Sequence, residues 1–207
     1  MTDISSTPRY RPGDAKYAEI ISVARDVIMT TGFDGMTISN LSKKVGMTRS
    51  LFYHYFKNKD AVAKAVLNEE ISKYLGSLES WNARRETGNV EKALDDIVDV
   101  FYRAVDESSL FHQQLANSGN ASLYIRFMSE VADTIADYLA DTTVKDFVKY
   151  HPLPISNVHE TFYMMTIGLI SYIRSHPHAP KEVVKHVAAQ TLHIEEYLKK
   201  DEVMAPS

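Results

Sequence analysis

Apolar residues recur at three- and four-residue spacing along most of this chain, which is the pattern of amphipathic α-helices. In the first third, the pattern predicts helices over 16–31, 38–45 and 49–56, followed by a long helix over 59–81. No segment alternates apolar and polar residues as a half-buried strand does. We therefore expect an all-α fold of about nine helices.

The remaining two thirds continue in the same way. The spacing predicts helices over 91–107, 110–117, 123–141, 157–175 and 181–200. A polar stretch over 82–90 and two proline pairs, at 152 and 154 and at 177 and 180, separate some of them, because proline cannot continue a helix. The sequence shows no internal repeat and no low-complexity tract.

Capping residues mark the ends of the short helices between 38 and 56. Thr37 and Thr48 stand where each helix begins, and threonine is a good N-cap. Gly46 stands where the first helix must stop, and glycine adopts the left-handed conformation at little steric cost. Asn58 can cap the long helix that follows. The two short helices are therefore expected to be joined by a tight turn.

The second of these short helices is unusually aromatic. Phe52 and Phe56 are four residues apart and can face the core together, which leaves Arg49, Ser50, Tyr53 and His54 pointing outward. A helix–turn–helix needs this arrangement, with one face packed on its neighbour and the other carrying hydrogen-bond donors into a major groove.

The same stretch resembles the DNA-binding half of the tetracycline-repressor (TetR) family of bacterial transcription regulators. The resemblance rests on Gly-Met-Thr at 46–48, on the run SLFYHYF at 50–56 and on Lys-Asn-Lys at 57–59. It departs from the usual family pattern at three positions. The family often has a long polar side chain where this chain has Ser39, usually an acidic capping-box residue where it has Asn40, and usually alanine where it has Ser42. By matching positions, the resemblance implies phosphate contacts from Thr37, Thr48, Tyr53, Tyr55 and Lys59, and contacts to base edges from Ser39, Arg49, Ser50 and Tyr53. His54 lies on the same predicted outward face.

Charge is distributed unevenly along the chain. The whole chain has a net charge of −4. Residues 1–64 hold ten Lys and Arg against six Asp and Glu, a net charge of +4, and the rest of the chain has a net charge of −8. A basic N-terminal module on an acidic body suits phosphate contact at one end only. Chance segregation of charge is the alternative.

Aromatic residues and methionines of the body form a second group of interest. They could line a cavity for a small apolar or aromatic ligand, as the family resemblance implies, or they could simply fill a core. The candidate ligand-binding residues are Phe101, Tyr102, Phe111, His112, Tyr124, Phe127, Met128, Phe162 and Met165.

The helix predicted over 157–175 is apolar nearly all round, so it must be buried on more than one side. A partner subunit is the simplest way to cover its second side, since two-fold dimers are common; a central helix in a monomeric bundle is the alternative. Small residues on this helix would let two helices approach closely. The candidate dimer contacts are Met164, Ile167, Gly168, Ser171 and Ser175, with Val184, Val187 and Thr191 on the last helix.

Several other classes of protein and site are disfavoured. The chain has no cysteine, which excludes disulfides and thiolate ligands. It has eight histidines but no HExxH motif, no Gly-rich phosphate loop and no G-x-S-x-G elbow, so we expect no metal site, no cofactor and no enzymatic activity. The longest apolar run, over 163–173, is too short to span a bilayer, and no signal peptide precedes residue 13. We therefore expect a protein of the bacterial cytoplasm.

These patterns together predict a flexible arm over 1–15, a helix–turn–helix DNA-binding domain over 16–60 and a helical regulatory and dimerisation domain over 61–207, entered by the connecting helix over 59–81. The resemblance implies a homodimeric repressor that binds an operator of inverted symmetry and is released by a small-molecule effector. The alternative is the same fold used as an architectural DNA binder, or as one controlled by a protein partner.

Overall fold

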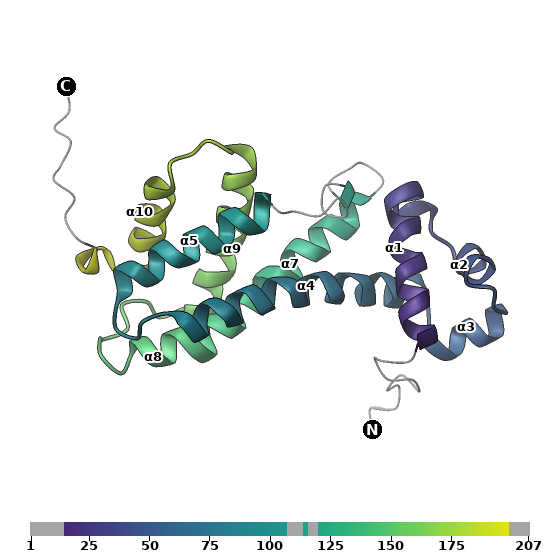
Figure 1. Cartoon of the computed structure of the whole chain (residues 1–207), viewed down its shortest axis with the longest axis horizontal. Coiled ribbons are helices and arrows are strands. Elements are labelled where there is room, and N and C mark those ends of the chain that lie inside the picture. Colours follow the sequence, from purple (N-terminus) through teal and green to yellow (C-terminus); the bar gives the residue numbers. More distant parts are fainter. Residues whose placement is uncertain (1–14, 107–113, 116–119, 199–207) are drawn as a thin grey trace. The chain divides into compact units, whose positions relative to one another are not determined.

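A computed structural model of the chain describes residues 15–106, 114–115 and 120–198 (Figure 1). The predicted arm (except Ala15), most of the predicted helix over 110–117, and the end of the last predicted helix lie outside the described residues. The helices are α1 (Ala15–Gly35), α2 (Ile38–Val45), α3 (Arg49–Tyr55), α4 (Lys59–Arg84), α5 (Val90–Asp106), α7 (Ala121–Leu139), α8 (Lys145–Phe147), α9 (Val158–Ser175) and α10 (Lys181–Leu192). No strand occurs in the described ranges, and the all-α fold class is confirmed.

The chain divides into two compact units. Of the described residues, the N-terminal unit holds those up to Glu70 and those from 114 to Phe127. The C-terminal unit holds 71–106 and those from Met128 to 198. α4 is one continuous helix whose first part belongs to the N-terminal unit and whose second part belongs to the C-terminal unit.

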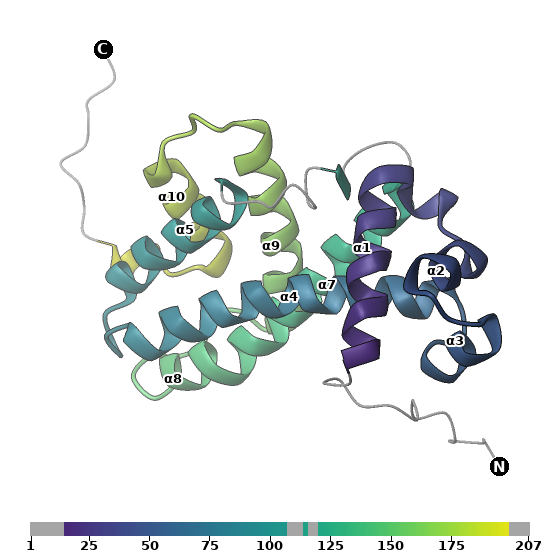
Figure 2. The ribbon, with the colours of Figure 1, turned by 45° about the vertical axis from the view of Figure 1, so that its right-hand side comes forward.

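In the N-terminal unit, α2 packs between α1 and α3 (Figures 1 and 2). The apolar face predicted for α1 is confirmed, because its members Ile20, Ala24, Val27 and Ile28 are all buried. α1 is broken at Gly32, which has φ 75° and ψ 164°. Only glycine adopts that conformation at low cost, and the break allows Phe33 to turn into the core.

In the C-terminal unit, α5, α9 and α10 pack against one another. A small core forms where α5 meets α10, from Leu94, Ala188, Ala189 and Ile194. The helix predicted over 181–200 is wrong from residue 193 to residue 198, because His193 adopts a left-handed conformation with φ 54° and ends α10. The backbone N–H of Ile194 then bonds to the carbonyl of Ala189 at 2.9 Å, and its side chain enters the core.

α7 ends differently from the prediction. A π-helical turn, Ala140–Val144, follows α7 directly and leads into α8. The predicted helix over 123–141 is therefore continued to Phe147 by a widened turn. Turns of this kind are rare and occur frequently at functional sites.

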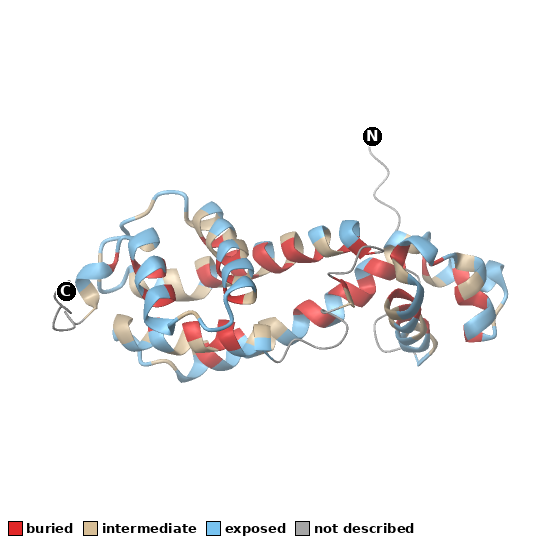
Figure 3. Cartoon of the chain, turned by 90° about the horizontal axis from the view of Figure 1, so that it is seen from above, coloured by how far each residue is buried: buried red, intermediate tan, exposed pale blue. Residues whose placement is uncertain are grey.

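Buried and exposed positions follow the helical period on most of the described helices (Figure 3). This agreement between burial and the apolar spacing explains why helices could be predicted here from the pattern alone. In the part of the chain that the structure describes, no helix is both long enough and apolar enough to cross a membrane.

Candidate functional site

The turn between α2 and α3 is built by local hydrogen bonds. Thr37 Oγ1 accepts from the Asn40 N–H at 3.1 Å and caps α2. Gly46 ends α2 with φ 68° and ψ 39°, and the Met47 N–H bonds to the Ser42 carbonyl at 2.9 Å. The left-handed glycine with this bond pattern reverses the chain directly after α2. The predicted cap and turn are confirmed.

α3 is held at its start and along its inner face. Thr48 Oγ1 accepts from the Leu51 N–H at 3.2 Å, which confirms the predicted cap. Phe52 and Phe56 are buried with ring centroids 6.1 Å apart, and Tyr17 of α1 stacks on Phe56 at 4.9 Å. These contacts fix which face of α3 turns outward.

The outward face of α3 carries the side chains predicted to contact DNA. Arg49, Ser50, Tyr53 and His54 are exposed, and Tyr55 is half-buried. Thr37, Ser39 and Thr48 are also exposed at or near the ends of α2 and α3. Apart from the half-buried Tyr55, these predicted residues are therefore accessible on the N-terminal unit, and Lys43, Lys44 and Lys57, which are near them in sequence, are exposed too. A helix that presents polar and basic side chains in this way suits a major groove.

The Lys59 ammonium is engaged in contacts within the protein. It donates to the Phe33 carbonyl at 3.3 Å and lies 4.4 Å from the centroid of the Phe33 ring. Asn58 Oδ1 accepts from the Ala61 N–H at 2.8 Å, so the predicted cap of α4 is confirmed. In this conformation Lys59 stabilises the broken end of α1, and its contact with a phosphate stays a prediction.

Two polar contacts that tie α1 to the rest of the N-terminal unit were not predicted. Asn120 is buried, its Oδ1 accepts from the Phe33 N–H at 2.7 Å, and its Nδ2 donates to the Ile28 carbonyl at 3.4 Å. Arg25 pairs with Glu69 at 2.6 Å and with the buried Glu70 at 3.1 Å. A single Asn or Arg has no pattern in sequence that would predict such long-range contacts.

The C-terminal unit contains a cavity of about 130 Å³ with largely apolar walls. Three of the predicted ligand-binding residues line it: Phe101 of α5, and Phe162 and Met165 of α9. Its wall also includes Trp81 and Arg85 from the end of α4 and its following turn, which were not predicted from the sequence.

The other predicted ligand-binding residues lie elsewhere. Phe111 and His112 fall outside the described residues. Tyr102 is buried, but its hydroxyl donates to the Ala179 carbonyl at 2.8 Å, and burial raises its pKa. Of the described residues, Tyr102, Tyr124, Phe127 and Met128 do not line the cavity. Tyr124 and Phe127 belong to the N-terminal unit, whereas Phe101 and Phe162 belong to the C-terminal unit.

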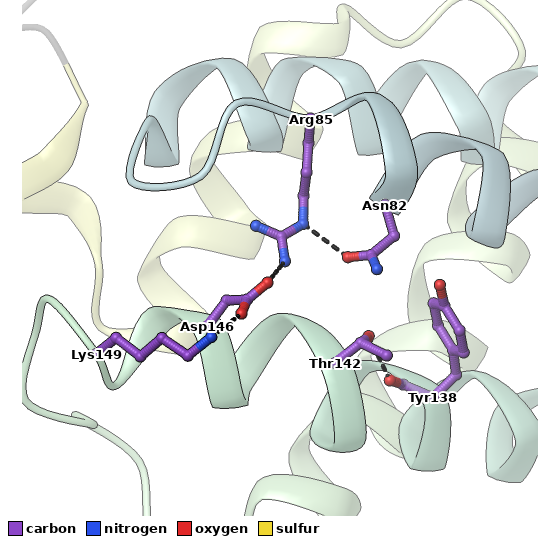
Figure 4. A network of polar contacts seen from close by, with 6 residues as sticks. All are labelled: Asn82, Arg85, Tyr138, Thr142, Asp146 and Lys149. Carbon is purple, nitrogen blue, oxygen red and sulfur yellow. Dashed lines mark hydrogen bonds and ion pairs between the residues drawn. The ribbon is translucent and has the colours of Figure 1, made fainter.

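A polar network lies at the cavity wall (Figure 4). Arg85 Nη2 donates to Asp146 Oδ2 at 2.5 Å, and Arg85 Nε donates to Asn82 Oδ1 at 2.7 Å. Asp146 also accepts from Lys149 at 2.7 Å. Hydrogen bonds from Lys149 and Arg85 lower the pKa of Asp146 below its usual value. The wall therefore combines a charged network with apolar surface.

α9 and α10 carry an exposed face with apolar members. Met164 has 67% of its surface exposed, and Ser171, Ser175, Val187 and Thr191 are exposed as well. Gly168 is exposed, and a Cβ added there would meet no atom within 4 Å.

Two predicted dimer contacts contribute less to this face. Val184 is only 2% exposed and packs within the unit, and Ile167 is half-buried. Val183 and Tyr172, which were not predicted, are exposed instead. The helical period places Val184 on the inner side of α10 once its packing on α5 is known.

Histidines are frequent towards the end of the chain. His176, His178, His186 and His193 are all exposed. In the described ranges, no group of three or more His, Asp or Glu side chains is placed to hold a metal ion.

Part of the N-terminal unit matches a known protein family. The family model described as "Bacterial regulatory proteins, tetR family" matches residues 20–66. The HTH-type transcriptional repressor AcnR of Corynebacterium jeikeium is 36% identical over 55 residues, which are 27% of this chain and 29% of that protein. The fatty acid metabolism regulator protein of Bacillus subtilis is 28% identical over 79 residues, which are 38% of this chain and 41% of that protein. The chain thus aligns with less than half the length of these two relatives.

A solved structure extends the likeness over most of the chain. The fatty acid degradation regulator FadR from Bacillus halodurans superposes with a TM-score of 0.59, covering 88% of this chain and 97% of that one at 18% identity. At this identity the likeness shows the fold alone. Together with the helix–turn–helix geometry, the match at 20–66 leads to one conclusion: the N-terminal unit contains a DNA-binding module of the kind found in bacterial regulatory proteins of the tetR family.

Proposed function

We propose that this protein is a DNA-binding transcriptional repressor that acts as a homodimer and leaves its operator when a small, largely apolar ligand binds the C-terminal unit. The outward face of α3 carries this proposal. It presents Arg49, Ser50 and Tyr53 on a helix that is capped by Thr48 at its start and by Phe56 at its end. The inner face of this helix is buried. A rigid helix with exposed donors is what base readout in a major groove requires.

Repression is supported by the name of the Corynebacterium jeikeium relative, which is a repressor. A regulator of this kind acts in the bacterial cytoplasm, where its operator lies. The arginine Arg49 is suited to guanine, because its guanidinium can donate two hydrogen bonds to O6 and N7. Thr37, Thr48, Tyr55 and Lys59 are proposed to contact phosphates, which fix the orientation of the protein on DNA.

Dimerisation is supported by the exposed face of α9 and α10, with Met164, Gly168 and Val187. An isologous dimer built on this face carries two copies of α3, which read two half-sites related by a two-fold axis. The expected operator is therefore an inverted repeat.

Ligand control is supported by the cavity lined by Phe101, Phe162 and Met165. A ligand shifts the equilibrium only if it binds the DNA-free arrangement of the dimer more tightly than the DNA-bound one. α4 is the element that can carry this change, because it belongs to both units.

Selection of bound DNA from a random pool by the full chain tests the proposal. We expect an enriched site with inverted symmetry, whose affinity falls steeply with salt because basic side chains displace counterions. The Arg49→Ala variant serves as the control and should enrich a less specific pool. No enrichment by the parent chain would overturn the DNA-binding proposal, and an enriched site without inverted symmetry would overturn the dimeric reader. Enrichment with no response to any small molecule would instead favour control by a protein partner.

A further inference from the structure

The cavity in the C-terminal unit opens to solvent on one side. Its exposed lining residues, among those the structure describes, come from two segments, the turn between α4 and α5 and the stretch that follows α8. They are Glu86, Gly88 and Asn89 in the first segment, and Tyr150, Leu153 and Pro154 in the second. A small molecule from solvent therefore enters the apolar space between these two segments.

Charged side chains of the cavity wall do not balance. Among the described lining residues, Arg85 carries a positive charge, whereas Glu86 and Asp146 each carry a carboxylate. Hydrogen bonds from Lys149 and Arg85 hold the pKa of Asp146 below its usual value, so this carboxylate is ionised at neutral pH. The wall therefore holds more negative than positive charge from these three side chains.

The Arg85 guanidinium is already engaged by the protein (Figure 4). Its Nη2 donates to Asp146 Oδ2 at 2.5 Å, and its Nε donates to Asn82 Oδ1 at 2.7 Å. Its central carbon lies 5.7 Å from the centroid of the Trp81 ring. Only 6% of the Arg85 side chain is exposed. A carboxylate in the cavity would therefore have to compete with Asp146 for this cation.

These charges favour an uncharged occupant. A carboxylate that leaves water without gaining a counterion loses hydration energy, and Glu86 and Asp146 would also repel it. A cation fares no better, because Asp146 already pairs with Arg85 and Lys149, and Glu86 is exposed to solvent that screens its charge. An uncharged apolar molecule avoids these losses and gains from contact with the apolar walls.

We infer that the cavity takes an uncharged apolar molecule and rejects carboxylates, and that Asp146 sets this specificity. Asp146 does so by occupying the Arg85 guanidinium, to which a carboxylate would otherwise bind. A cavity of similar volume in an engineered protein core holds benzene, so the molecule is close to a single benzene ring in size. This inference rests on the ligand control proposed above and names the chemical class of the effector.

Calorimetric titration of the full chain with matched aromatic probes tests the charge preference. Acetophenone and benzoate have the same ring and the same number of non-hydrogen atoms, but only benzoate is charged, and benzylammonium supplies the opposite charge. We expect acetophenone to bind at least about tenfold more tightly than either ion. The titrations are run at about pH 8, above the range in which an ordinary histidine is protonated, because His151 also lines the cavity.

Asp146→Asn should change this preference. It keeps the shape of the side chain and removes the carboxylate that pairs with Arg85. The affinity for benzoate should rise by about tenfold, because the guanidinium gains an anionic partner, and the affinity for acetophenone should change by less than about twofold.

Asp141→Asn is the matched control. It removes the same charge from the π-helical turn, where Asp141 is exposed and pairs with Lys145 at 2.7 Å. Asp141 is not among the described residues that line the cavity. This variant should therefore leave the affinities for benzoate and acetophenone unchanged.

Glu86→Gln is a second test that does not disturb a buried ion pair. Removing one partner of the pair between Arg85 and Asp146 can destabilise the unit, so the melting temperature of each variant is measured. Glu86 is exposed at the opening of the cavity, and glutamine keeps an oxygen that accepts from Asn89. The affinity for benzoate should rise in this variant as well, by a smaller factor than in Asp146→Asn.

Ala93→Leu locates the binding site. Ala93 of α5 lines the cavity, and a larger apolar side chain there fills the space without changing any charge, so acetophenone binding should be lost. The inference is overturned if acetophenone does not bind the parent chain, if either ion binds as tightly, or if Ala93→Leu keeps full affinity. It is also overturned if neither Asp146→Asn nor Glu86→Gln raises the affinity for benzoate.

A fluorescence anisotropy assay with the selected operator separates this inference from the proposed function. Acetophenone should release the operator from the parent chain. Binding of acetophenone without release would keep the specificity of the cavity and overturn ligand control. Operator selection needs no ligand, so a failure of DNA binding is distinguished from a failure of the charge preference.

Discussion

Ser42 and Asn120 are both buried polar residues of the N-terminal unit, but their polar atoms have different surroundings. The two polar atoms of the Asn120 side chain bond to the backbone of α1. The Ser42 hydroxyl has no hydrogen-bond partner in the part of the chain that the structure describes. The unpaired Ser42 hydroxyl therefore lowers the stability of the fold, whereas the hydrogen bonds of Asn120 raise it. Point substitutions at the two residues can separate these effects.

Ser42→Ala should stabilise the protein. Removing a buried, unsatisfied hydroxyl should raise the free energy of unfolding by about 1 kcal/mol. Urea denaturation followed by circular dichroism measures this change. Ser22→Ala, on the exposed side of α1, corrects for the higher helix propensity of alanine, which is below about 0.7 kcal/mol. A Ser42→Ala gain no larger than that of Ser22→Ala would mean that the hydroxyl is satisfied in solution.

Asn120→Ala should have the opposite effect. It leaves the Phe33 N–H and the Ile28 carbonyl without this partner, and the free energy of unfolding should fall by at least about 2 kcal/mol. Asn157→Ala is a suitable control, because the Asn157 side chain makes no capping bond to α9. Equal urea midpoints for the Asn120→Ala variant and the parent would contradict the role assigned to this contact.

At the scale of elements, the caps of α2, α3 and α4 follow the sequence closely. Thr37, Gly46, Thr48 and Asn58 each act on backbone atoms within four residues, so their role can be predicted from sequence alone. The end of α10 could not be predicted in this way. His193 adopts a positive φ where Gly or Asn is expected, and the burial of Ile194 accompanies that conformation.

α3 is the element whose function is most directly testable. Arg49→Ala should relax the preference at one base per half-site, at a cost of ~1–3 kcal/mol on the preferred operator. Anisotropy titrations against the selected site and its single-base variants measure the loss. Arg49→Lys keeps the charge but not the planar guanidinium, so it should preserve the salt dependence and lose the base preference. Equal losses on all sites would assign Arg49 to a phosphate instead.

At the scale of the whole molecule, the assembly depends on the exposed face of α9 and α10. A Cβ at Gly168 meets nothing within 4 Å in the chain, so a larger residue should be tolerated by the monomer. If two copies approach there, the same residue must separate them. The two arrangements therefore predict opposite effects of one substitution.

Gly168→Leu should weaken the dimer and, in dilute solution, raise the helical stability of the monomer, since glycine costs about 1 kcal/mol relative to alanine inside a helix. Sedimentation velocity over a dilution series measures the association. Val187→Glu is a second variant, which places two like charges near the two-fold axis if α10 takes part. Gly76→Ala in α4 is the control for helix propensity, because a Cβ there also meets nothing within 4 Å. A Gly168→Leu protein that stays dimeric would move the interface away from Gly168.

The sequence by itself determined the helical class, the helix–turn–helix and its caps, because helical spacing and capping act over a few residues. It also identified Phe101, Phe162 and Met165 as aromatic and methionine side chains of the body. Only the tertiary structure decided that these three line a cavity while Tyr102, Tyr124, Phe127 and Met128 do not. Only the tertiary structure brought Trp81, Arg85, Thr143 and Asp146 together from distant segments. The reason is physical: a residue's spacing predicts which side of its own helix it occupies, but packing between helices decides what that side faces.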